Sequence, residues 1–76
     1  MTNNLKSTTL NIKKFGFNLW KIRTEKEMTR EALADAIGLA DQRIIYDYEN
    51  GNKFRKLERA LLIAVALGVD LDSMFR

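Results

Sequence analysis

The sequence of 76 residues contains no cysteine, no histidine and no proline. A chain without cysteine forms no disulfide and offers no thiolate, which fits a reducing cytoplasm. Because histidine is missing as well, the usual zinc ligands, the commonest general base and the commonest thiol nucleophile are all absent. We therefore expect a protein that binds no metal or cofactor and is not an enzyme.

Long hydrophobic runs are missing too. The longest one, residues 60–67, is far shorter than the roughly 20 residues needed to cross a bilayer. The N-terminus also lacks the apolar segment of a secretory signal. We expect a cytoplasmic protein with no membrane partner, and a chain of this length can form only one small domain.

Basic residues gather on both sides of the middle of the chain. Lys and Arg number 13 against 10 Asp and Glu, which gives a formal charge of +3. Basic residues outnumber acidic ones over residues 1–30, and a second basic cluster follows at Lys53, Arg55, Lys56 and Arg59. Both clusters lie where a phosphate backbone could run if the central part of the chain entered a groove.

The first predicted helix runs from about Asn11 to Lys26. Its apolar residues recur at helical spacing, at Ile12, Phe15, Leu19 and Ile22. The preceding residues are polar and rich in Thr, Asn and Ser. We therefore expect 1–10 to form a flexible arm and 11–76 to form the folded domain.

Two short helices joined by a glycine-containing turn follow. Thr29 can cap the first of them, and Gly38 ends it. Asp41 can cap the second, which we place at about 42–49 and which Gly51 ends. This pattern is typical of a helix-turn-helix, a motif whose second helix fits the major groove of DNA.

A fourth helix is apolar along most of its length. We expect its inner face to consist of Leu57, Ala60, Leu61, Ala64 and Leu67. Gly68 ends this helix, and a short fifth helix over 71–75 follows Asp70 as its cap. Since the sequence contains no strand signal and no repeat, it predicts an all-α fold of five helices.

Four groups of residues carry a family resemblance. They are Phe15-Gly16 with Leu19, Ile22 and Arg23; Thr29 with Leu33-Ala34 and Gly38-Leu39; Tyr48-Glu49-Asn50-Gly51; and residues 61–69. In this order and spacing they resemble the lambda-repressor/Cro-type (Xre-type) helix-turn-helix family. The resemblance implies a five-helix, lambda-repressor-like DNA-binding domain that regulates transcription in the manner of a repressor. It also implies double-stranded DNA as partner and a homodimer on an inverted-repeat operator.

One departure from the family affects the register of the third helix. The family's spacing after the turn glycine would place Asp47 in the core, and an unpaired buried carboxylate costs several kcal/mol. One extra residue in the turn buries Ile45 and Tyr48 instead. We favour this longer turn.

With this register the outward side of the third helix carries the predicted base contacts: Gln42, Arg43, Ile44, Tyr46 and Asp47. Arg43 can pair with guanine, Gln42 can pair with adenine, and Asp47 can accept from cytosine. Ile44 or Tyr46 can cover a thymine methyl. An ordinary solvated helix face is the alternative, and Asp47 can equally brace Arg43 one turn away.

Phosphate contacts are predicted on either side of that helix. Arg30 stands at the start of the second helix, where the family usually has a phosphate-binding Gln. The loop after the third helix resembles a backbone-contacting segment and supplies Asn52, Lys53, Arg55 and Lys56. These residues would position the domain without reading sequence, and a solvated charge cluster is the alternative.

Arg23 and Glu49 resemble a pair that links the first and third helices in the family. We therefore assign them a structural salt bridge, which would fix the third helix against the first. Glu27 stands where the family often has a glycine at the end of the first helix.

Leu62 and Val65 point away from the predicted inner face of the fourth helix. With Val69, Met74 and Phe75 they form a predicted dimer interface, because a self-complementary apolar patch supports a twofold dimer. Burial against the last helix of the same chain is an equal alternative.

Phe17 and Trp20 also lie off the core side of the first helix. We favour Leu5, Leu10 and Ile12 as their cover over a partner site. A protein partner bound here, or at the patch on the fourth helix, would make the chain a protein-interaction module of the same fold, which is the alternative function.

Overall fold

The computed structural model describes residues 4–51 and 57–76, with side chains described from Ile12 onward. Its elements are α1 (Asn4–Glu25), α2 (Arg30–Ala36), α3 (Arg43–Glu49), α4 (Leu57–Leu67) and the 3-10 helix η1 (Leu71–Phe75). Every element in these two ranges is helical, which confirms the all-α class. The short fifth helix predicted over 71–75 is present as a 3-10 helix, so the described residues form four α-helices and one 3-10 helix.

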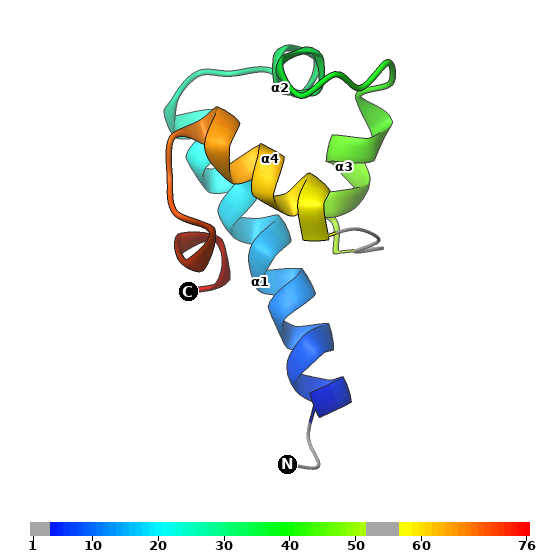
Figure 1. Ribbon diagram of the computed structural model, residues 1–76, viewed down its shortest axis with the longest axis vertical. Helices are drawn as coiled ribbons and strands as arrows, with labels where there is room; N and C mark the ends of the chain where they lie inside the picture. Colours follow the sequence, from blue (N-terminus) through cyan, green and yellow to red (C-terminus); the bar gives the residue numbers. More distant parts are fainter. Residues whose placement is uncertain (1–3, 52–56) are drawn as a thin grey trace.

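Helix α1 runs along the longest dimension of the molecule, which measures 38 × 21 × 18 Å, and its first turns extend past the other helices (Figure 1). It begins at Asn4, so the predicted start near Asn11 is wrong and residues 4–10 of the predicted arm are helical. No proline or glycine interrupts residues 4–15, and extending an existing helix costs far less than starting one. The division into an arm, 1–10, and a domain, 11–76, stays a prediction.

The core is built from all five elements. Its largest completely buried side chains are Phe15, Leu19, Leu33, Ile45, Ile63, Leu67 and Met74. Helix α1 contacts both α3 and η1, while α2 packs on α3 and α4. The second helix of the motif therefore rests on α1 as well as on its partner in the motif.

The inner face of α4 differs from the predicted one. Ala60, Ile63, Ala64 and Leu67 are buried, whereas Leu57 and Leu61 are 64% and 49% exposed. The prediction was wrong because nearly every residue of α4 is apolar, so periodicity did not distinguish the buried side from the exposed one. Ile63, which we did not assign to the inner face, takes the central place.

Met74 lies in the core and not on an exposed patch. It is completely buried, and the Phe75 ring lies 5.3 Å from the Phe15 ring between centroids. Asn18 in α1 donates its Nδ2 hydrogen to the Met74 carbonyl oxygen at 2.9 Å, which ties η1 to α1. The prediction that Met74 lines a dimer surface is therefore wrong, because η1 folds back on its own chain.

The helix ends follow the predicted signals in part. The Thr29 hydroxyl accepts a hydrogen bond from the Ala32 backbone N–H at 3.0 Å, as expected of the N-cap of α2. Asp70 occupies the N-cap position of η1 without a side-chain hydrogen bond to the helix. Glu27 has a φ of +56°, the left-handed conformation that glycine adopts at lower cost. A family-like glycine would thus suit this position.

Candidate nucleic-acid interface

The register of α3 is the one predicted with the longer turn. Ile45 is completely buried and Tyr48 is 3% exposed, while Asp47 is exposed. The turn before α3 is closed by a hydrogen bond from the Leu39 backbone N–H to the Ala34 carbonyl oxygen at 2.8 Å, with Gly38 at a φ of +79°. Asp47 therefore lies outside the core, as the longer turn predicts.

The structure brings four of the five predicted base-contacting residues to one exposed side of α3 and its N-cap. Gln42, Arg43, Tyr46 and Asp47 are exposed, whereas Ile44 is half-buried and packs against the core. An exposed row of donors, an acceptor and a ring on one side of a helix can meet base edges in a major groove. Ile44 belongs to the border of this row.

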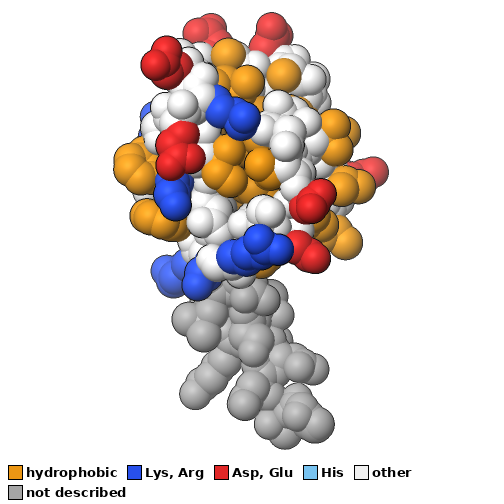
Figure 2. Space-filling model, turned by 90° about the vertical axis from the view of Figure 1, so that its left-hand side faces the viewer, with side chains coloured by type: hydrophobic (Ala, Val, Ile, Leu, Met, Phe, Trp, Pro, Cys, Tyr) orange, Lys and Arg blue, Asp and Glu red, His pale blue; other side chains and the backbone are white. Residues whose placement is uncertain are grey.

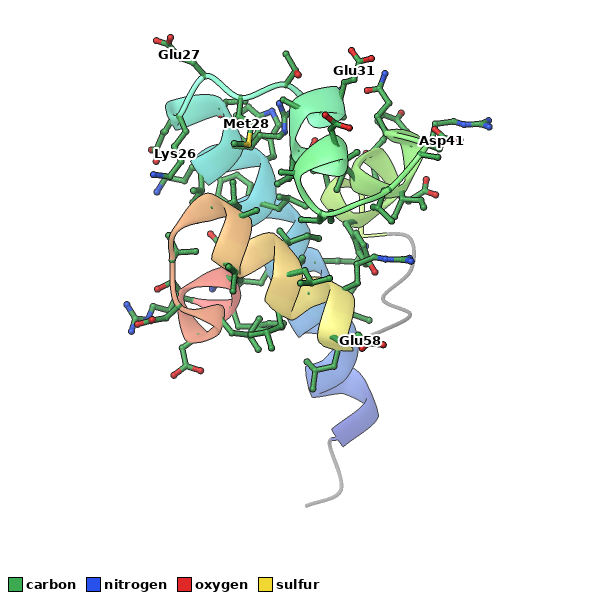
Figure 3. All side chains as sticks on the ribbon, turned by 45° about the horizontal axis from the view of Figure 1, so that its top comes forward. Lys26, Glu27, Met28, Glu31, Asp41 and Glu58 are labelled. Carbon is green, nitrogen blue, oxygen red and sulfur yellow. The ribbon has the colours of Figure 1, made fainter. Side chains whose placement is uncertain are left out.

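The N-terminal end of α3 is held by Asp41. Gln42 and not Asp41 occupies the N-cap position, but Asp41 Oδ1 accepts the Arg43 backbone N–H at 2.8 Å and Oδ2 accepts from Arg43 Nε at 3.2 Å. The first of these bonds is the main cause that lowers the pKa of the Asp41 carboxyl below its ordinary value. Figure 3 shows the Asp41 side chain on the outer side of the molecule.

The C-terminal end of α3 is held by a buried carboxylate between two arginines. Glu49 Oε2 lies 2.5 Å from Arg23 Nε, and Glu49 Oε1 lies 2.9 Å from Arg30 Nε. The side chains of Glu49 and Arg23 are only 4% and 9% exposed. Arg23 also donates from Nη1 to the Met28 carbonyl oxygen at 2.7 Å, so the guanidinium connects α3 with the turn that follows α1.

Gly16 allows α1 and α3 to approach closely at the same place. A Cβ atom on Gly16 would overlap the Tyr48 carbonyl oxygen and would lie 2.8 Å from that of Glu49. Both obstacles are backbone atoms, so neither can rotate away. Gly16 belongs to the family motif, but nothing in the sequence indicates which element it faces.

Arg30 has contacts that the sequence did not reveal. Besides its bond to Glu49, its guanidinium carbon lies 5.1 Å from the centroid of the Tyr46 ring. These partners lie 19 and 16 residues further along the chain, and neither spacing nor composition indicates such contacts. Arg30 therefore links α2 to α3. Its contact with a DNA phosphate stays a prediction.

A groove of about 550 Å³ opens between α1 and α3. Phe17 and Trp20 line it from α1, with ring centroids 5.9 Å apart, and Tyr46 lines it from α3. Phe17 and Trp20 are 57% and 45% exposed, so the predicted cover by the N-terminal residues Leu5, Leu10 and Ile12 is wrong. Those residues belong to the same continuous helix and do not fold back over it.

The remaining predicted phosphate contacts, Asn52, Lys53, Arg55 and Lys56, lie outside the described residues. Figure 2 shows acidic, basic and hydrophobic side chains mixed over one face of the molecule. Neither sign of charge dominates that face. Among residues 4–51 and 57–76 there is no acidic cluster that could hold a metal ion, and no helix there is long and apolar enough to span a bilayer.

Four apolar side chains project from the other side of α4. Leu57, Leu61, Leu62 and Val65 are 48% to 68% exposed, and we call them the outer face of α4. Of the predicted dimer residues, Leu62 and Val65 belong to this face. Val69 and Phe75 are half-buried and pack against the core.

A helix-turn-helix family model matches residues 21–74, which include the whole of α2 and α3. The chain belongs to this family. The match confirms the resemblance to lambda-repressor/Cro-type proteins and identifies the chain as a DNA-binding regulator of transcription. The family consists of DNA-binding regulators and not of enzymes.

Among the solved structures that are similar to the chain is one that matches over nearly its whole length. It is the crystal structure of the restriction-modification controller protein C.AhdI from Aeromonas hydrophila, with a TM-score of 0.77 and 33% sequence identity. The similarity covers 84% of this chain and 96% of that one. No curated protein matches the sequence.

Proposed function

We propose that the chain regulates transcription by placing α3 in the major groove of a specific operator, in the manner of a repressor. The exposed row of Gln42, Arg43, Tyr46 and Asp47 carries this proposal, because the opposite side of the same short helix is fixed in the core by Ile45 and Tyr48. A helix held on one side presents its other side in a fixed orientation.

Arg43 is the residue on which we expect sequence recognition to depend most. Its side chain is 83% exposed and its guanidinium can donate two hydrogen bonds to guanine. Replacing Arg43 by Ala should cost about 1–3 kcal/mol of binding and relax the preference at one base pair. Lys26→Ala removes the same charge at an exposed position on the opposite side of the molecule from Asp41 (Figure 3), and it should leave base preference unchanged.

Selection of bound sequences from a random duplex pool tests the proposal. A palindromic consensus, altered at one position per half-site by Arg43→Ala, is the expected result. Uniform weakening over all sequences would remove Arg43 from the base contacts, and failure to select any consensus would contradict sequence-specific binding.

The outer face of α4 supports a homodimer. Four leucine and valine side chains exposed on one helix form a patch that a second copy can cover symmetrically. Two copies related by a twofold axis would read an inverted repeat. Sedimentation at micromolar concentration should show a dimer, and a strictly monomeric protein with and without DNA would contradict this part of the proposal.

Among regulatory roles, we favour control of a restriction-modification system. As a regulator of transcription, the protein would act in the cytoplasm. The similarity to the controller protein C.AhdI over nearly its whole length supports this role. The selected consensus should then occur upstream of genes for a nuclease and a DNA methyltransferase. A consensus found only within phage or toxin operons would contradict it.

A protein-interaction module is the second candidate, because Phe17 and Trp20 line an exposed groove beside α3. Weak DNA binding that does not depend on salt, together with a tight protein partner at this groove, would favour that function. Tight and salt-dependent binding to one duplex sequence would exclude it as the main role.

A further inference from the structure

Arg30 lies between the two helices of the motif and contacts both a charged and an aromatic residue of α3. It is the first residue of α2, and its Nε donates to Glu49 Oε1 at 2.9 Å. Its guanidinium carbon lies 5.1 Å from the centroid of the Tyr46 ring. One side chain therefore connects the start of α2 with two successive turns of the proposed recognition helix.

Glu49 fixes the position of the Arg30 guanidinium. The carboxylate itself is held by Arg23 and is nearly inaccessible to solvent, so it cannot follow a moving partner. The Arg30 side chain is 36% exposed, and its guanidinium is held by Glu49 through Nε while its central carbon lies over the Tyr46 ring. This cation–π contact, which we call the Tyr46 stack, restricts the Tyr46 side chain, which is otherwise half-exposed and lines the groove beside α1.

We propose that Arg30 is a positioning residue for sequence recognition: it fixes the Tyr46 ring in the orientation in which that ring meets a base. This rests on the proposed function, in which Tyr46 covers a thymine methyl. A phosphate contact by Arg30, the role predicted from the sequence, does not require the Tyr46 stack and would affect all DNA sequences alike.

The chemistry of the contact requires arginine and not only a positive charge. A guanidinium can donate to a carboxylate in its plane while its face lies on an aromatic ring, whereas a lysine ammonium is a compact charge without a flat face. Arg30→Lys therefore keeps the charge available to a phosphate and removes the stack. This single variant separates the two roles of Arg30.

The experiment measures the affinity of the full chain for the selected duplex and for duplexes changed at one base pair at a time. Wild type, Tyr46→Ala, Arg30→Lys and Arg30→Gln are compared at several salt concentrations. Tyr46→Ala should reduce the preference at one base pair per half-site by about fivefold or more. Arg30→Lys should reduce the preference at that same base pair and leave the salt dependence of binding unchanged.

Arg30→Gln removes the charge as well. It should reduce the same base preference and, if Arg30 also contacts a phosphate, lower the salt slope by about one unit. Melting curves identify any variant that does not fold, and NMR shifts of the Tyr46 ring in free Arg30→Lys give a second readout, since loss of the stack should move them.

An unchanged base preference in Arg30→Lys would overturn the proposal, as would Tyr46 ring shifts equal to those of wild type. If Tyr46→Ala alters no base preference while Arg43→Ala does, the positioning role fails and the proposed function stands. If wild type itself shows no preference among duplexes, the proposed function fails first. Each result is therefore assigned to one proposal or the other.

Discussion

The contact between α1 and α3 and the outer face of α4 differ in how their side chains are satisfied within one chain. At the first, Gly16 lets two backbones meet, and Glu49 is held by two arginines while almost hidden from solvent. At the second, leucine and valine side chains of the outer face of α4 project into solvent and have no cover among the described residues.

The difference indicates two kinds of function. A short helix of seven residues is marginal by itself, so its orientation depends on the elements that it packs against. The α1–α3 contact supplies that orientation and leaves the other side of α3 available for DNA. The outer face of α4 instead carries apolar surface that a single copy leaves exposed, which is the property expected of an interface.

The largest effect is expected at Gly16. Gly16→Ala places a Cβ against the backbone oxygens of Tyr48 and Glu49, so α3 must move away from α1. We expect a loss of about 4 kcal/mol or more in the free energy of unfolding, because the overlap involves backbone that cannot repack. Urea denaturation followed by circular dichroism measures it.

Gly38→Ala is the matched control for this change. A Cβ there meets no atom within 4 Å, but the residue has a φ of +79°. Its cost should be only about 1–2 kcal/mol, that of the left-handed conformation for a residue with a side chain. Equal losses for the two variants would show that the close approach of α1 and α3 contributes nothing beyond backbone conformation.

The second effect tests the buried charges of the same contact. Glu49→Ala leaves the Arg23 guanidinium buried with the Met28 carbonyl oxygen as its remaining acceptor among the described residues. A buried charge that loses its partner costs about 3 kcal/mol or more in the free energy of unfolding. Thermal and urea unfolding of the variant measure the loss.

Arg30→Ala is the control for Glu49→Ala, since it leaves Glu49 still paired with Arg23. We expect a smaller loss, about 1 kcal/mol, because the Arg30 side chain is partly exposed and the buried pair stays intact. If the two variants lose the same stability, the buried pair of Arg23 and Glu49 is not what distinguishes this region.

The third effect is expected at the outer face of α4. Leu62→Glu should weaken a homodimer by about 2 kcal/mol, or roughly 30-fold in Kd, because a charge replaces apolar surface in the interface. The folded monomer should lose little stability, since the side chain is exposed in one copy. Sedimentation and urea unfolding measure the two quantities separately.

Phe17→Glu introduces the same charge at another exposed apolar residue and should leave dimerisation unchanged. A large loss of monomer stability in Leu62→Glu, without a change in association, would show that the face is satisfied within one chain after all. The two regions of the molecule would then be alike.

The sequence was most informative where one helix register had a clearly lower free energy than the others. Asp47 could not be buried, and this requirement alone set the register that buries Ile45 and Tyr48. Sequence patterns did not predict the buried side of α4, because apolar residues lie on all sides of this helix. For this reason we assigned Leu61 to the inner face in place of Ile63.

Contacts between distant residues that no family motif marks were beyond the sequence for a different reason. Arg30 and Glu49 are brought together only when α2 and α3 fold against α1, and charge alone would have allowed Arg30 many other partners. Met74 was wrongly assigned to a dimer surface for the same reason, because a segment of five residues has no periodicity that shows whether it folds back onto the core. Local patterns predict helices, whereas the pairing of helices depends on packing that no local pattern contains.

The smallest effect is expected at Asp41, at the N-terminal end of α3. Asp41 and Glu49 both accept hydrogen bonds from arginines, but only the Glu49 side chain is buried. The Arg43 N–H lowers the pKa of Asp41, so the folded state binds a proton less readily than the unfolded chain. The resulting stabilisation is present above the unfolded pKa of about 3.9 and is lost as the pH falls through the lower folded value.

Asp41→Asn keeps an acceptor for the Arg43 N–H and removes the charge. Wild type should therefore exceed Asp41→Asn in urea midpoint by a constant amount above about pH 5, and this difference should shrink below about pH 4. It should be smaller than the loss in Glu49→Ala and should fall at high salt, because water and ions screen an exposed pair. A difference that persists unchanged at pH 3 would mean that the carboxylate charge of Asp41 does not stabilise the start of α3, and that hydrogen bonding alone holds this end of the helix.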